Sequence, residues 1–135
     1  MTIAMACDER SLALKEALKK HLEDRGFTCM EFSDVTGAAN AVSAGVCERG
    51  IVLDEAGVSA CVEANHVRGV RCAPLNNTMS ARMTREHNDT NMMTMASANI
   101  GQMLALEIAD KWLDTAFSGV ERHQRRIDKV MAYEA

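Results

Sequence analysis

Hydrophobic residues along the chain fall into short, unbroken runs that alternate with segments in which they recur every three or four positions. Unbroken runs of strand length are typical of strands buried on both faces. Recurrence at helical spacing is typical of helices with one buried face. We therefore expect five strands, at residues 2–7, 27–32, 50–53, 70–75 and 91–96. We expect six helices, at residues 11–25, 38–47, 60–66, 76–87, 100–117 and 122–133.

The alternation of these strands and helices predicts the class of the fold. It is typical of an α/β domain in which helices cover both faces of a mainly parallel sheet. We predict a three-layer, Rossmann-like arrangement around five strands. The length of 135 residues fits one domain, residues 1–135.

Candidate ligand positions follow from this fold, because such sheets bind ligands beyond the carboxyl ends of their strands. Asp8 and Glu9 follow the first expected strand, and Asp54 follows the third. An acid at such a position is more often a solvated loop residue, so the acids alone do not establish a site.

Composition and charge argue against a nucleic-acid-binding, membrane-spanning or secreted protein. The formal net charge of −4 argues against nucleic acid as a partner, since phosphates attract basic proteins. No apolar stretch approaches the roughly 18 residues of a membrane span. The first residues lack the basic start of a secretory signal, so we expect a cytoplasmic protein that does not enter a membrane.

The sequence offers no motif for a cofactor. Five cysteines without a CxxC motif predict reduced thiols and no metal site, with Cys7, Cys29 and Cys72 buried in strands. There is no GxGxxG or Walker motif, so a nucleotide cofactor is not expected either.

Three segments carry a more specific pattern, at residues 49–59, 80–91 and 119–126. The first joins an apolar run to a loop that contains Gly57. The second leads from a Ser-Ala pair to His87 and Asn88, and the third places Arg122 and Arg126 one helical turn apart. Together they resemble the family of sugar-phosphate aldose–ketose isomerases that contains ribose-5-phosphate isomerase B and the galactose-6-phosphate isomerase subunits. The resemblance extends over nearly the whole chain.

The resemblance implies roles for particular residues. His87 would open the sugar ring, a step that suits imidazole because it gains and loses protons near neutral pH. Arg122 and Arg126 would bind the phosphate, with His123 and Arg125 as helpers. Asp54 stands where the family has its catalytic base. The other positions that the resemblance assigns to substrate binding are those of Asp8, Glu9, Gly57, Val58 and Asn88. The reaction passes through an enediolate and needs no metal or nucleotide.

The chain departs from the family pattern mainly in the loop that would hold the base. Many members have a cysteine at the position of Asp54, and an ordinary solvated carboxylate is a weak base for a sugar C–H. Other family residues are replaced by Glu9, Glu55, Ala56, Ser59 and Ala98. An aspartate here, followed by Gly57 and Val58, resembles the A-type subunit of galactose-6-phosphate isomerase, whose partner subunit carries the cysteine.

Asp54 and His87 are expected at opposite edges of the sheet, because Asp54 follows one strand and His87 precedes another. The long helix at 100–117 returns the chain to the edge of His87, where Arg122 and Arg126 should follow. A strand of this length spans about 17–20 Å, too far for one small sugar to touch both groups. We therefore predict a site shared between two chains, in a homodimer or in a hetero-oligomer with a cysteine-bearing relative, with the C-terminal helix at the dimer interface.

Three functions stay open at this point. The first is a complementing subunit that interconverts galactose 6-phosphate and tagatose 6-phosphate. The second is a self-sufficient enzyme of the ribose-5-phosphate isomerase B type that uses Asp54. The third is a sugar-phosphate-binding protein whose catalytic site has decayed.

Overall fold

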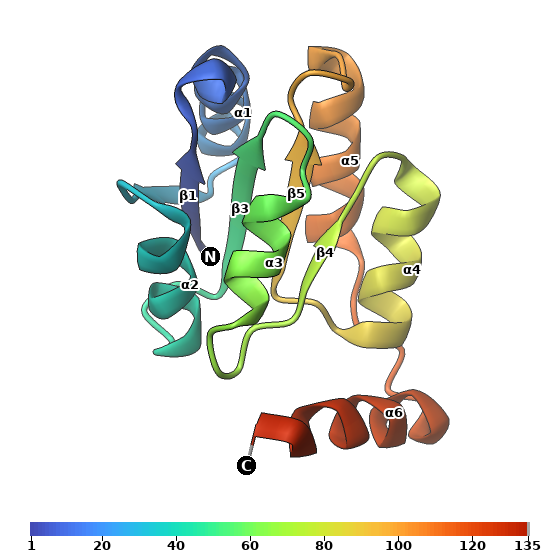
Figure 1. Ribbon diagram of the computed structural model, residues 1–135. Coiled ribbons are helices and arrows are strands. Elements are labelled where there is room, and N and C mark those ends of the chain that lie inside the picture. The colour runs from blue at the N-terminus through green and yellow to red at the C-terminus, as the bar shows by residue number, and fades with distance from the viewer. Residues whose placement is uncertain (135) are drawn as a thin grey trace.

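The five expected strands form one sheet in the computed structural model, which describes residues 1–134. They are β1 (Thr2–Cys7), β2 (Thr28–Glu31), β3 (Arg49–Asp54), β4 (Cys72–Pro74) and β5 (Met92–Ala96). Their order across the sheet is β2-β1-β3-β5-β4, and all neighbouring strands run parallel. All carboxyl ends therefore lie at one edge, drawn at the top of Figure 1.

Helices cover both faces of the sheet, which confirms the predicted three-layer α/β fold (Figure 1). These helices are α1 (Leu12–Asp24), α2 (Val35–Ser43), α3 (Ser59–Asn65) and α5 (Gln102–Asp114). Leu22 and Trp112 are fully buried on the face covered by α1 and α5, and Ala39 and Ala64 on the face covered by α2 and α3. The central residues of β1 and β3 are buried, as expected for strands covered on both sides.

Two further helices meet near the amino ends of the strands. α4 (Thr78–Asn88) packs beside α5 and ends at Asp89, which has a left-handed backbone with φ 46°. An extended segment, residues 115–120, then leads from α5 to α6 (Glu121–Met131), which lies below the sheet and against the end of α4 (Figure 1). The predicted role of α6 in dimerisation stays a prediction.

Several boundaries differ from the expected ones because of local caps. α2 begins three residues earlier than the expected helix at 38–47, since the Asp34 carboxylate accepts a hydrogen bond from the Gly37 amide at 2.7 Å. It also ends earlier, and Gly45 follows with a φ of +78°. The fourth strand is shorter than expected, and a 3-10 turn at Glu9–Ser11 precedes α1. No helix within residues 1–134 combines the length and apolar content that a membrane crossing requires.

Candidate functional site

Asp54 holds together the loop between β3 and α3. One of its carboxylate oxygens accepts a hydrogen bond from the Gly57 amide, and the other accepts one from the Ala60 amide at 3.0 Å. The carboxylate thus satisfies N–H groups that the start of a helix leaves without partners. Both oxygens are engaged in shaping the loop, and the role of Asp54 as a base stays a prediction.

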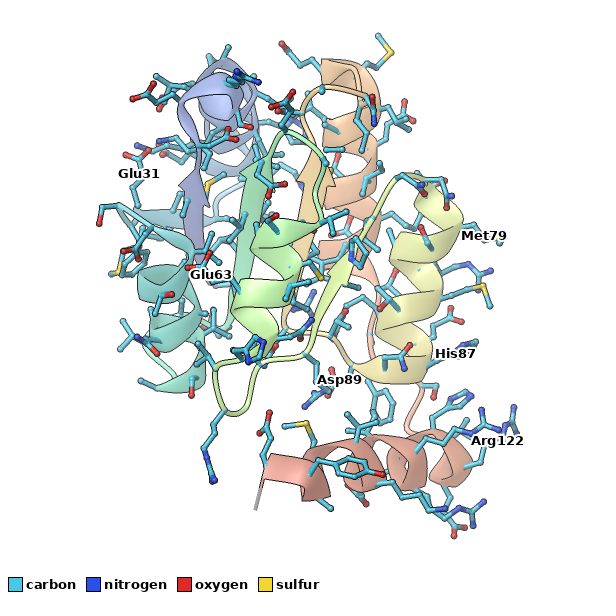
Figure 2. All side chains as sticks on the ribbon, viewed as in Figure 1. Glu31, Glu63, Met79, His87, Asp89 and Arg122 are labelled. Carbon is cyan, nitrogen blue, oxygen red and sulfur yellow. The ribbon has the colours of Figure 1, made fainter. Side chains whose placement is uncertain are left out.

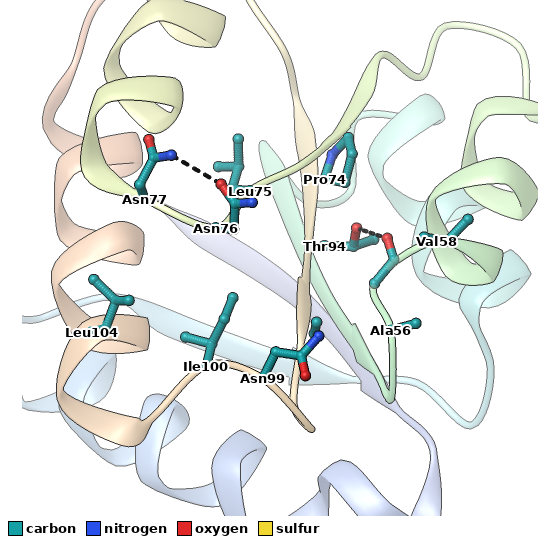
Figure 3. Close-up of a pocket in the computed structure, with 12 residues that line it drawn as sticks. Ala56, Val58, Pro74, Leu75, Asn76, Asn77, Thr94, Asn99, Ile100 and Leu104 are labelled. Atoms are coloured by element: carbon teal, nitrogen blue, oxygen red, sulfur yellow. Dashed lines mark hydrogen bonds between the residues drawn. The ribbon is translucent and has the colours of Figure 1, made fainter.

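Gly57 lets this loop pass close against β5. Its φ is +74°, and a Cβ atom placed on it would lie 3.1 Å from the backbone nitrogen of Ala96. The Thr94 hydroxyl donates a buried hydrogen bond of 2.6 Å to the Gly57 carbonyl (Figure 3). The loop is therefore fixed to the sheet on one side, while Val58 beside it is exposed.

A pocket of about 570 Å³ opens next to this loop. Figure 3 shows that it is bounded by the loop, by the segment that precedes α4 and by the start of α5. Three carboxamides line it, those of Asn76, Asn77 and Asn99, beside apolar groups such as Ile100 and Leu104. Carboxamides donate and accept hydrogen bonds, which suits the hydroxyl groups of a sugar.

The adjoining hollow at this edge is acidic. Asp8, Asp54 and Glu55 line it together, and Asp8 also accepts a hydrogen bond of 3.0 Å from the Ser11 amide. Arg10 forms an ion pair with Glu55 in which both side chains are largely exposed. Three carboxylates against one cation would repel a phosphate, so the phosphate of a substrate needs its cations from elsewhere.

The opposite edge carries the histidines. His87, in the last turn of α4, stacks against His123 of α6, with ring centroids 4.4 Å apart. His123 is buried, and its Nδ1 lies 2.8 Å from the hydroxyl of Ser118. Burial lowers the pKa of His123, and the nearby charges of His87, Arg122 and Arg126 lower it further. His123 is therefore neutral at pH 7.

Arg122 and Arg126 lie on α6 at the same edge as His87. Both are exposed, and Figure 2 shows Arg122 directly below His87. Arg126 lines a pocket between α4, α6 and β4 together with Asn88. Within residues 1–134 neither guanidinium group has an ion-pair partner, so both can bind an anion close to the histidine pair.

Two arginines that carry no predicted role hold the end of α4 in place. Arg71 donates to the carbonyl of Asn88 at 3.0 Å and to that of Asp89 at 2.7 Å. The buried Arg85 donates to the carboxylate of Asp89 at 2.7 Å and to the carbonyl of Thr90 at 2.6 Å. Arg85 lies four residues after Ala81, so both side chains lie on the same buried face of α4.

The structure thus gathers the candidate residues into two groups at opposite edges of the sheet. Asp8, Asp54, Gly57 and Val58 lie at the carboxyl edge, and His87, Asn88, Arg122 and Arg126 lie at the amino edge. β3 separates the groups, as Figure 1 shows. Glu9 follows Asp8 but does not line either pocket at that edge. Within residues 1–134, no group of three or more His, Cys, Asp or Glu side chains is placed to hold a metal ion.

Comparison with known proteins gives concordant results. A family model described as Ribose/Galactose Isomerase matches residues 3–130. The putative sugar phosphate isomerase YwlF of Bacillus subtilis is 38% identical over 99% of this chain and 97% of its own length. The galactose-6-phosphate isomerase subunit LacA of Streptococcus pneumoniae is 35% identical over 96% of this chain and 97% of its own. The structure of ribose-5-phosphate isomerase B from Clostridium thermocellum has a TM-score of 0.96 at 34% identity, covering 99% of this chain and 97% of that one.

Proposed function

Because this chain belongs to the ribose/galactose isomerase family, we propose that it is one subunit of an aldose–ketose isomerase acting on galactose 6-phosphate. The product is tagatose 6-phosphate, and each active site is built from two chains. This chain contributes the histidine and the phosphate-binding arginines, and a relative with a cysteine at the position of Asp54 contributes the base. The separation of Asp54 and His87 by the length of β3 is the observation that carries the proposal.

The amino-edge group supplies ring opening and phosphate binding. His87 is half-buried and faces solvent beside a neutral imidazole, so it can give a proton to the ring oxygen and take one from the hydroxyl. Arg122 and Arg126 bind the phosphate of the same sugar, and Asn88 contacts a hydroxyl group. Arg71 supports this arrangement, because its bonds to the end of α4 keep Asn88 in position.

At the carboxyl edge, the catalytic base would come from another chain. A base must remove the proton from C2 of the open-chain sugar and return it to C1, while backbone N–H groups stabilise the enediolate between these steps. Both oxygens of Asp54 already accept backbone hydrogen bonds, and Glu55 places a negative charge beside the N–H groups. These contacts support a structural role for Asp54 and a thiolate base from a cysteine-bearing subunit.

The test is an exchange experiment in deuterated water, followed by NMR of galactose 6-phosphate. Three samples are compared: this chain alone, a cysteine-bearing relative alone, and the two mixed. We expect deuterium at C2 and tagatose 6-phosphate in the mixture well beyond the sum of the separate samples. The proposal would be contradicted if exchange and product formation in the mixture do not exceed the sum of the two separate samples. Sugar-phosphate binding without turnover in every sample would instead favour a decayed site.

A second function is supported by the likeness to Clostridium thermocellum ribose-5-phosphate isomerase B, which is as close in sequence as the LacA subunit. In this alternative the chain pairs with itself and acts on ribose 5-phosphate with Asp54 as its base. Turnover of ribose 5-phosphate by the chain alone, abolished in Asp54→Asn, would establish it. The absence of exchange in the chain alone would exclude it for that substrate.

A further inference from the structure

Two thiols meet where α3 packs against β4. Cys61, in α3, is 7% exposed, and Cys72, the first residue of β4, is half-buried. The Cys61 thiol donates a hydrogen bond of 3.4 Å to the backbone carbonyl of Cys72. Neither cysteine has a role in the proposed isomerase site, so their pairing calls for a separate explanation.

The side chain of Asn65 fixes the position of Cys72 relative to Cys61. Its carboxamide donates to the carbonyl of Cys72 at 3.0 Å and accepts from the amide of Cys72 at 2.8 Å. The same nitrogen lies 3.6 Å from the sulfur of Cys61, one helical turn earlier. α3 and β4 therefore cannot slide past one another at this level without breaking the two hydrogen bonds between Asn65 and Cys72 and the one from the Cys61 thiol.

The two thiols differ in acidity. The neighbouring Cys72 thiol lowers the pKa of Cys61 to about 7, although burial opposes this, and Thr94 lowers it further. The same contact and burial raise the pKa of Cys72. Thiolates are the reactive form of cysteine, so Cys61 is the one equipped to react first.

We propose that Cys61 and Cys72 form a reversible disulfide when the protein meets hydrogen peroxide. The thiolate of Cys61 attacks one peroxide oxygen, the O–O bond breaks, and the departing hydroxide takes up a proton to become water. The thiol of Cys72 then attacks the resulting sulfenic acid, the S–S bond forms, and the hydroxyl group leaves as a second water. The two sulfurs lose two electrons between them, and one peroxide gains them.

The surroundings allow this chemistry and connect it to the substrate loop. Cys72 and Asn65 line the pocket between β4, α4 and α6, which gives a small oxidant a route to the pair. The Asp54 carboxylate accepts a hydrogen bond from the amide of Ala60, the residue before Cys61, and the Thr94 hydroxyl donates to the Gly57 carbonyl of the same loop. A disulfide here would fix α3 directly behind the loop that Asp54 shapes.

The test is peptide mapping of the full chain after treatment with hydrogen peroxide and alkylation of the remaining thiols. Trypsin cleaves after Arg68 and Arg71, so the two cysteines fall in separate peptides, residues 50–68 and 72–82. We expect these peptides to be joined by a disulfide that dithiothreitol reverses. Cys61→Ala and Cys72→Ala should abolish the linkage, whereas Cys29→Ala, which removes a thiol whose pKa burial raises to about 11, should leave it unchanged.

A second measurement uses the unoxidised protein. The rate of Cys61 alkylation by iodoacetamide, followed against pH, should have a midpoint near 7 in the wild type and a higher midpoint in Cys72→Ala. The proposal is overturned if the midpoint is that of an ordinary thiol in both proteins. It is equally overturned if peroxide takes Cys61 to a sulfinic acid without linkage, or links other cysteines as readily.

Discussion

The imidazole rings of His87 and His123 lie against each other with centroids 4.4 Å apart and planes inclined by 42°. Two protonated imidazoles at this distance would repel each other, and His123 is the buried member of the pair. Because the pKa of His123 is lowered, we expect His87, which is more accessible, to donate and accept the protons of the reaction. α6 therefore contributes to the site in two ways, through its arginines and through a neutral ring that supports His87.

His87→Gln should impair turnover of sugars that form rings and spare sugars that do not. In the assembly that isomerises galactose 6-phosphate, we expect kcat to fall about 100-fold or more, since the general acid–base group is lost. A tetrose 4-phosphate cannot close a ring through its phosphorylated oxygen, so its turnover should change little. Parallel kinetics on the two substrates make the comparison, and an equal loss on both would assign His87 another role.

Arg122→Ala and Arg126→Ala should each weaken substrate binding. Loss of a charge-assisted hydrogen bond to phosphate is expected to raise KM about 10- to 100-fold, with a smaller effect on kcat. Lys129→Ala is the matched control, because Lys129 is an exposed cation on the same helix to which no role in phosphate binding is assigned. Equal effects of all three substitutions would indicate a general loss of positive charge rather than a phosphate site.

His123 should make the folded state less stable in mild acid. Its folded-state pKa lies below the unfolded value of about 6.5, so the unfolded chain binds more protons as the pH falls below that value. The free energy of unfolding should therefore decrease between pH 7.5 and 5.5, and His123→Asn should reduce the decrease. Urea unfolding at several pH values measures it, with the exposed His66→Asn as control. Parallel curves for wild type and His123→Asn would contradict the expectation.

Gly57→Ala should destabilise the protein by about 2–4 kcal/mol, since the new methyl group combines positive-φ strain with a clash against the backbone of β5. Its Cβ would lie 3.1 Å from the nitrogen of Ala96. Gly45→Ala separates the two effects, because Gly45 also has a positive φ, +78°, but no atom within 4 Å of the added Cβ. Thermal and urea unfolding should place Gly45→Ala at about 1–2 kcal/mol, from strain alone. Equal losses would show that the clash is relieved by movement of the loop.

The fold could be predicted from the sequence because its central strands are continuous apolar runs. The bounds of β1 were predicted without error, and those of β3 and β5 to within one residue. The cysteines were harder to place: Cys7, Cys29 and Cys72 are half-buried rather than buried, while Cys47 and Cys61 are the buried ones. Burial depends on which face of an edge strand or helix is covered, and spacing alone does not determine this.

The division of the site between two edges also followed from the order of strands and helices. The contact between His87 and His123 did not, because the position of α6 depends on the extended segment 115–120, which has no repeating pattern. The bonds from Asp54 to the loop were not foreseen either, since they require the left-handed conformation of Gly57. Local dihedral angles of this kind are set by tertiary contacts such as that of Thr94.

The hydrogen bonds of Asn65 also affect whether two molecules can pair through the edges of their sheets at high protein concentration. β4 is an outer strand of the sheet, and such a strand exposes N–H and C=O groups to which a strand from another molecule can add. The Asn65 carboxamide occupies the outward N–H and C=O of Cys72, making the two hydrogen bonds that an added strand would make. β4 is only three residues long, so this one side chain closes much of the edge. Asn65 thereby makes the β4 edge of the sheet a poor template for edge-to-edge aggregation.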